Sequence, residues 1–482
     1  ESSKSKKFNY ITKNKWFLFS DQNTKRKNLI INKKISRKKF IKNITIASFG
    51  IFNFSCYLNM ANQKNKRISN FQLKHDPNGI INLINGFKYK ILSEKGNTMS
   101  DGIQVPDHAD GMASFQGTEG RIILIRNHEI GHFKKVEDLL RLNPLYNEND
   151  FIKKNITKFY DLCTNNKPCG GGTTTIVYNP ITNQVENEYL SLAGTLVNCS
   201  GGITPWNTWI SCEETVNIKG NGLLKNHGYN FEVIPSEKIN LNKPIPLKAM
   251  GRFRHEAIAI DPNNYIAYQT EDRNDGLIYR FIPFNKQKYS QGGNLQAIKF
   301  SDKPGLDTRN WDSETIKLNK RYSIEWINLN NIDNNKDDLR FRGFNKGAAI
   351  FARPEGMWYF KNNIYFTCTS GGKNKLGQIW KYNIKNEYLE LFFESTNKDT
   401  MELCDNLTIA PWGDVIICED GKGMDRIIGI KQNGSSYVIA ENIFNNSEFA
   451  GANFSPDGKI LFVNIFSPTK TLAINGPWEK LI

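Results

Sequence analysis

A short hairpin-like motif recurs along the chain, and this repetition constrains the fold more than any other feature of the sequence. In "HEAIAIDPNNYIAYQTED", residues 255–272, two apolar runs flank a turn of Asp, Pro and Asn, which is typical of a β-hairpin. The pattern returns in "CSGGITPWNTWISCEE", "PEGMWYFKNNIYFTCTSGG", "DNLTIAPWGDVIICEDG" and "AGANFSPDGKILFVNI", and more loosely in "DGMASFQGTEGRIILIRNHE". Unevenly spaced repeats of short strands are the signature of a β-propeller.

The six copies predict an all-β fold, a six-bladed β-propeller that spans residues 71–482. A pair of β-sandwiches would explain the strands, but it would not explain why the same turn and the same ends recur. The stretch 284–350 holds no copy and is partly rich in Asn and Lys. We therefore expect it to be an inserted polar excursion that stands off the propeller.

The N-terminal segment differs from the rest of the chain in charge. Residues 1–70 hold 17 of the 64 Lys and Arg residues but only 2 of the 48 acidic residues. The remainder is nearly neutral, which argues against a nucleic-acid partner. An apolar run at 44–54 follows a basic run; it is too short to span a membrane and has the size of a signal h-region, so we expect no stable membrane insertion.

"SRKKFIK", residues 36–42, resembles a twin-arginine export motif in which Lys38 replaces the second arginine. Residues 1–70 are therefore predicted to be an export signal, and the alternative is a basic disordered segment. The expected location is the periplasm or the cell surface, reached by the twin-arginine pathway. In such a compartment Cys163 and Cys169, which share one loop, could form a disulfide.

The ends of the hairpins carry acidic residues at recurring positions, counted from Pro262 and its equivalents in the turns. The residues six positions before the turn are Cys199, Glu256, Glu355, Asp405 and Ala450, and Asp110 takes this place in the looser copy. The residues nine positions after the turn are Glu214, Glu271, Ser370, Asp420 and Ile465, and Glu129 takes the equivalent strand-end place in the looser copy. Because the innermost strands of a propeller line its central channel, we expect these positions to form two rings at one mouth.

So many like charges repel one another strongly unless cations neutralise them. Carboxylates favour hard cations such as calcium, and a thiolate adds a softer metal, iron or zinc. The predicted metal ligands are Cys199, Glu214, Glu271, Glu355, Asp405, Glu419 and Asp420. Any one of these acids taken alone could instead be a solvated strand end. Cys212, Cys368 and Cys418 share a different repeat position, which indicates packing.

Arg353 precedes Glu355 by two residues, so both side chains lie on the same side of a strand. An arginine beside several cations is suited to bind two oxygens of a phosphate. The alternative is an arginine that only balances the charge of the ring. We predict that Arg353 and Glu355 are the catalytic pair.

Several motifs together resemble the PhoX-type alkaline phosphatases: "RNHE", "GGGTTT", "RHEAIAID", "TEDRNDGLIYRF", "GAAIFARPEGMW" and the hairpins quoted above. The resemblance runs from about residue 100 to the C-terminus. It implies a six-bladed propeller that hydrolyses phosphate monoesters outside the cytoplasm, with two ferric ions and several calcium ions. We further expect a monomer that acts on small phosphate esters. The resemblance also implies that Cys199, Glu214, Glu271 and Glu355 ligate metal, and that Arg353 binds phosphate.

Two other functions remain open from the sequence. One is a non-catalytic propeller stabilised by calcium that binds a partner, and the other is a lactonase-like hydrolase with a single calcium ion. The thiol and the many acids of the two rings favour more than one metal ion, which argues against both.

Overall fold

The computed structural model describes residues 71–131, 150–164 and 168–482. The predicted export segment, residues 1–70, lies outside the described residues. The described chain is built mainly of β-strands, with the short helices α3 (Asp150–Asn155) and α4 (Leu339–Asn345). No helix among these residues is long and apolar enough to cross a membrane.

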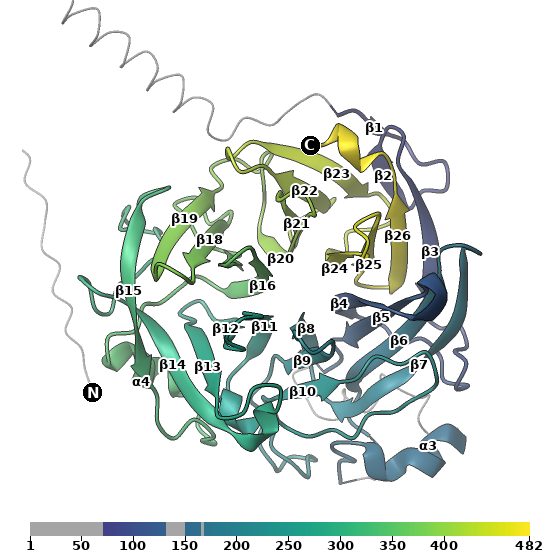
Figure 1. Cartoon of the computed structure of the whole chain (residues 1–482), viewed down its shortest axis with the longest axis horizontal. Coiled ribbons are helices and arrows are strands. Elements are labelled where there is room, and N and C mark those ends of the chain that lie inside the picture. The colour runs from purple at the N-terminus through teal and green to yellow at the C-terminus, as the bar shows by residue number, and fades with distance from the viewer. Residues whose placement is uncertain (1–70, 132–149, 165–167) are drawn as a thin grey trace, which may run out of the picture. The chain divides into compact units, whose positions relative to one another are not determined.

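The sheets are arranged like the blades of a propeller, with their first strands at the centre (Figure 1). Each central strand contacts the next in chain order, and the last contacts the first, so that they form a closed ring. The central strands are β4 (Ala109–Gln116), β8 (Asn198–Ile203), β11 (His255–Ile260), β16 (Pro354–Phe360), β20 (Cys404–Ile409) and β24 (Phe449–Phe454). The predicted hairpin motifs therefore form the inner wall of the fold.

In two of the sheets, the strands lie side by side in chain order, starting from the central strand. In the first, β4 is followed by β5 (Ile122–His128), β6 (Gly171–Asn179) and β7 (Gln184–Thr195). In the second, β8 is followed by β9 (Trp209–Glu213) and β10 (Asn230–Val233). All the neighbouring strands pair antiparallel.

A nine-stranded sheet contains both β11 and β16 as its two edges. From β11 it continues through β12 (Ala267–Glu271), β13 (Ile278–Pro283), β14 (Gly293–Phe300) and β15 (Arg321–Asn328). It then returns through β19 (Tyr388–Glu394), β18 (Gln378–Asn383) and β17 (Asn363–Cys368) to β16. The stretch 284–350, which we expected to stand off the propeller, supplies β14 and β15 to this sheet, because its strands pair on both sides.

The N-terminal strands complete the last two sheets. The sheet of β20 continues through β21 (Val415–Glu419), β22 (Arg426–Ile430) and β23 (Ser436–Asn442), followed by β2 (Ile81–Ile84) and β1 (Leu73–Lys74). The sheet of β24 continues through β25 (Ile460–Ile465) and β26 (Lys470–Asn475), followed by β3 (Lys88–Glu94). Pairing of β3 with β26 joins the two ends of the described chain and closes the ring.

Apolar side chains fill the space between neighbouring sheets. Between the last two sheets, Ile416 and Ile439 pack with Val463 and Leu472, and all four are fully buried. Each side chain of this size stabilises the fold by about 1.5–3 kcal/mol when it is fully buried. The packing holds the sheets, and with them the central strands, in fixed positions.

The predicted all-β, propeller-like arrangement is thus confirmed. The described strands form five sheets, because β15 joins two groups of strands into one. The count of six blades stays a prediction.

Candidate metal centre

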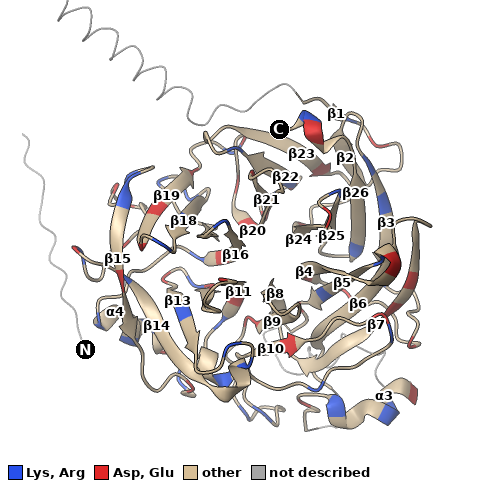
Figure 2. Cartoon of the chain, in the orientation of Figure 1, with Lys and Arg blue, Asp and Glu red and all other residues tan. Residues whose placement is uncertain are grey.

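A cavity of about 440 Å³ lies where the central strands begin and the second strands of the hairpins end. Figure 2 shows acidic residues on β11, β16 and β20 around the centre of the view. The cavity is lined by His108, Asp110, Glu129, Cys199, Glu214, Arg254, Asp272, Arg353, Glu355, Asp405, Asp420, Glu448 and Phe466. Eight of these side chains are acidic, against two arginines and one histidine.

A β-bulge near the start of each central strand aims side chains into this cavity. The strand register shifts directly after Ala109, Asn198, His255, Pro354, Cys404 and Ala450. In five of the six strands, the first residue after the point where the register shifts is an acid or Cys199. Bulges change the direction of side chains next to functional sites. Here a similar bulge in each of these strands directs one ring residue toward the cavity.

Glycines beside the ring residues allow the central strands to approach closely. A Cβ atom on Gly111 would lie 2.5 Å from the Cα of Ser200, and one on Gly356 would lie 2.6 Å from the backbone N of Leu407. Neither contact is possible for a larger residue without moving the backbone. These glycines follow Asp110 and Glu355 directly, so the close approach lies next to the ring.

Cys199 lies between two acids of the ring. Its Sγ is 2.9 Å from Oδ2 of Asp110 and 3.1 Å from Oε1 of Glu256. Burial, together with the charges of neighbouring acids, raises the pKa of both carboxyl groups well above the ordinary range. Burial also raises the pKa of the Cys199 thiol. The cavity without cations therefore favours protonated groups, and cations would favour the charged forms.

Three groups of donor atoms overlap around this thiol. Within each group the ligand atoms lie within 4.8 Å of one another. The groups are Asp110 with Glu129 and Cys199, Cys199 with Glu214 and Glu256, and Glu256 with Glu355 and Asp405. Because neighbouring groups share a member, the arrangement suits several adjacent ions better than one.

Buried oxygens without partners support this interpretation. Among the described residues, Oδ1 of Asp110, Oε2 of Glu256 and Oδ1 of Asp405 are buried and have no hydrogen-bond partner. A buried polar atom without a partner costs about 1–3 kcal/mol. The donor set of carboxylates and one thiol therefore fits bound hard cations together with a softer metal.

Two arginines reach the cavity from positions two residues before the ring. Nε of Arg353 lies 3.0 Å from Oδ1 of Asp272, and the same guanidinium contacts Glu355. Nη1 of Arg254 lies 3.3 Å from Oε1 of Glu214. Both arginine side chains remain about one third exposed, at 32% and 33%. Each is held by a carboxylate and keeps part of its guanidinium accessible from the cavity.

A family model described as alkaline phosphatase PhoX matches residues 69–469. The chain belongs to the PhoX alkaline phosphatase family. The structure of Pseudomonas fluorescens PhoX in complex with vanadate, a transition state analogue, is similar to this chain. The sequence identity is 17%, the alignment covers 83% of this chain and 96% of that chain, and the TM-score is 0.60, which shows a shared fold.

Other solved structures are less similar. A gluconolactonase from Xanthomonas campestris is 9% identical over 84% of this chain and 95% of that chain, with a TM-score of 0.36. A protein of unknown function from Bacteroides thetaiotaomicron is 12% identical over 81% of this chain and 76% of that chain, with a TM-score of 0.41. No curated protein matches the sequence.

The acidic cavity contains five of the seven predicted metal ligands, namely Cys199, Glu214, Glu355, Asp405 and Asp420, together with Arg353. Glu271 and Glu419 are absent from its lining. Glu271 accepts a hydrogen bond of 2.7 Å from the hydroxyl of Tyr279, and Glu419 pairs with Arg426 at 2.6 Å. Neighbouring side chains of a strand point to opposite sides, so the residues that follow them, Asp272 and Asp420, face the cavity instead.

Sequence reasoning did not select Asp272, Arg254, His108, Glu448 and Phe466 as site residues. A signal for three of them was present, because His108, Arg254 and Glu448 stand at the repeat position that Arg353 occupies, two residues before the ring. Phe466 stands at a strand end where other hairpins have an acid. Its ring stacks on that of His108, with centroids 4.8 Å apart.

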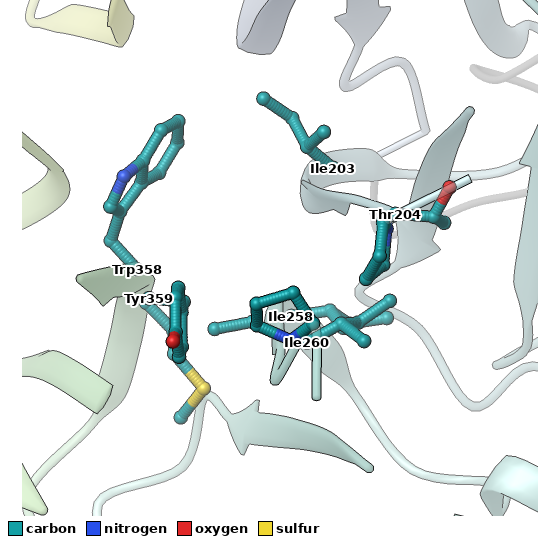
Figure 3. Close-up of a pocket in the computed structure, with 10 residues that line it drawn as sticks. Ile203, Thr204, Ile258, Ile260, Trp358 and Tyr359 are labelled. Atoms are coloured by element: carbon teal, nitrogen blue, oxygen red, sulfur yellow. The ribbon is translucent and has the colours of Figure 1, made fainter. Parts of the chain in front are cut away.

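A second cavity, of about 220 Å³, lies at the opposite ends of β8, β11 and β16 (Figure 3). Ile203, Ile258, Ile260, Trp358 and Tyr359 line it, and its lining contains no ionisable residue other than the phenol of Tyr359. This apolar cavity offers no donor set for a metal. Of these two cavities, only the acidic one carries side chains suited to metal chemistry.

Proposed function

We propose that this protein is a metal-dependent phosphomonoesterase that releases inorganic phosphate from small organic phosphate esters. The observation that carries the proposal is the acidic cavity of a PhoX family member, in which one thiol and two partly accessible arginines lie among eight carboxylates. Carboxylates alone would repel a phosphate ester. The cavity can bind a phosphate ester only when bound cations make its local charge positive.

The residues proposed to hold these cations are the overlapping donor groups around Cys199. Iron is proposed beside the thiolate and calcium among the carboxylates, because soft donors favour the transition metal and oxygen donors favour calcium. Such ions supply positive charge that stabilises the negative charge of the phosphate oxygens. The proposed ligands are Asp110, Glu129, Cys199, Glu214, Glu256, Glu355, Asp405 and Asp420.

Arg353 is proposed to bind and orient the phosphate. Asp272 and Glu355 contact its guanidinium and so fix the direction in which its remaining N–H groups point. A guanidinium held in this way donates two parallel hydrogen bonds to phosphate with little further loss of conformational freedom. Glu355 then has two roles, since it also belongs to a donor group with Glu256 and Asp405.

The finer description of the fold belongs to the same proposal. We infer six blades, because six central strands form the ring and the nine-stranded sheet has two of them at its edges. We further propose that residues 1–70 direct export of the folded monomer to the periplasm or the cell surface through the twin-arginine pathway. Fusion of residues 1–70 to a reporter that is active only after export tests this, and absence of export in a host with that pathway would contradict it.

The decisive experiment combines elemental analysis with an activity assay on the purified full chain. We expect iron and calcium to be present together, phosphate to be released from p-nitrophenyl phosphate, and the activity to be lost on chelation and restored by both metals. Vanadate should inhibit the enzyme. Calcium alone without phosphate release would refute the proposal and favour a binding propeller, and lactone hydrolysis in its place would indicate a lactonase.

A further inference from the structure

We propose that Cys163 and Cys169 are a modification site, at which oxidation forms a disulfide. The disulfide would support the side of the acidic cavity that contains Cys199. Both thiols are buried, each with 1% of its surface exposed. Their Sγ atoms lie 2.8 Å apart, so they need to move by less than about 1 Å to reach the covalent distance of about 2.05 Å. This proposal is independent of the phosphatase function.

The backbone around both residues is fixed by Asp161. Oδ1 of Asp161 accepts a hydrogen bond of 2.7 Å from the backbone N–H of Cys163, and its carbonyl oxygen accepts one of 3.0 Å from the N–H of Cys169. Cys163 has a φ of +53°, a left-handed conformation that costs energy for any residue with a Cβ. The surrounding contacts hold this strained conformation, and it brings the two sulfur atoms together.

A zinc ion is the alternative occupant, because Asp161, Cys169 and His227 have donor atoms within 4.8 Å of one another. Two observations favour the disulfide. Thiolates bound at about 2.3 Å to one tetrahedral zinc lie about 3.8 Å apart, which is farther than the two sulfur atoms here. Both ring nitrogens of His227 already contact carboxylates, Nδ1 with Glu213 at 2.6 Å and Nε2 with Asp161 at 3.3 Å.

The position of the two sulfur atoms in the fold indicates what the disulfide would stabilise. The two cysteines pack with Leu196, Val197 and Leu223 in one small core. Val197 joins two cavity segments, since its N–H donates to the carbonyl of Ile130 and its carbonyl accepts from the N–H of Glu214. Cys199 follows two residues later. A covalent bond beneath this junction would restrict the motion of the segment that presents Cys199 and Glu214.

Formation of the bond requires an oxidant of the disulfide class, such as oxidised glutathione. The two cysteine thiols lose two protons and two electrons, and glutathione disulfide accepts them to give two molecules of glutathione. The contact with Cys163 and burial raise the pKa of the Cys169 thiol, which suppresses the reactive thiolate in the folded protein. We therefore expect the bond to form during folding, before the thiols are buried.

The test is refolding of the full chain with oxidised and reduced glutathione, followed by alkylation in denaturant and peptide mass spectrometry. We expect Cys163 and Cys169 to resist alkylation until a reductant is added, in one cross-linked peptide that is lighter by two hydrogen atoms. Complete alkylation of both residues before reduction would overturn the proposal. Separate glutathione adducts on the two residues, or one zinc ion per chain that is lost on mutation of either residue, would also overturn it.

Thermal unfolding supplies a second measurement with a matched control. A reductant should lower the Tm of the wild type by roughly 2–5 °C, because the loop closed by residues 163–169 regains its freedom in the unfolded chain. The same shift should occur in Cys418→Ala, which removes a buried thiol from another core. It should be absent from the double variant Cys163→Ala/Cys169→Ala. An equal shift in all three proteins would contradict the assignment, and if the double variant fails to fold, the alkylation pattern decides.

Discussion

Removal of the metal that we propose to bind in the acidic cavity is expected to make the stability of the protein fall as the pH rises. Without cations, burial raises the pKa of Asp405 from 3.8 to about 6. Burial, together with the charge of Asp405, raises the pKa of Asp420 from 3.8 to about 7. In the unfolded chain both groups ionise near their ordinary values. Between about pH 4 and pH 7 the folded metal-free protein therefore binds more protons than the unfolded chain, so its free energy of unfolding decreases with rising pH.

The size of this decrease follows from the shifts. One pKa unit corresponds to about 1.4 kcal/mol, so the shift of Asp405 alone amounts to about 3 kcal/mol. The cavity acids titrate as a coupled set, and their individual shifts do not add. We expect a total loss of about 3–5 kcal/mol between pH 4 and pH 8 in the metal-free protein. In the metal-loaded protein the cations keep the carboxylates ionised across this range, and the loss should be much smaller.

The measurement is urea unfolding followed by tryptophan fluorescence, at several pH values between 4 and 8, with a chelator or with iron and calcium in excess. Asp101→Asn is a matched control, because burial also raises the pKa of Asp101, but its side chain is not part of the cavity lining. Its effect should be the same with and without metal. A metal-free protein that is as stable at pH 8 as at pH 5 would refute the reasoning.

Three further predictions concern individual side chains. Cys199→Ala should lose iron and phosphatase activity by elemental analysis and assay, whereas Cys212→Ala should keep both; retention of iron without Cys199 would refute the thiolate ligand. Arg353→Ala should keep its metals but weaken vanadate inhibition about 10- to 100-fold, as expected for the loss of a charge-assisted pair of hydrogen bonds of about 1.5–3 kcal/mol; unchanged inhibition would leave it a charge-balancing residue. Asp272→Asn should lower kcat/KM more than Glu271→Gln, which should instead lower the Tm, and the reverse order would contradict the geometry seen here.

The inner hairpins could be predicted from the sequence because each is a local unit with its own turn and alternating apolar residues. The closure of the fold could not be predicted in this way. Pairing of β3 with β26 joins segments that are almost the whole chain apart, and β15 pairs with β19 across two hairpins. Both pairings depend on tertiary packing, and the sequence of a strand does not specify its distant partner.

The same distinction explains which ring residues could be predicted. Positions counted forward from the turn locate Glu214 and Asp420 correctly, but the hairpin from His255 to Glu271 is one residue longer than that from Asn198 to Glu213. A change of one residue moves a side chain to the opposite side of a strand, so the count reaches Glu271 in place of Asp272.

The bulge supplies a better reference than the turn in the first five central strands, because the register shifts directly before the ring residue in each of them; in β24 it shifts one residue later. In three central strands the sequence marks it with a glycine directly after the ring position, at Gly111, Gly356 and Gly451. At each of these a Cβ would come within 2.6 Å of a neighbouring backbone atom, so the glycine is required by the close approach of the central strands. The close packing of these strands and the aim of the ring side chains into the cavity therefore depend on the same few residues.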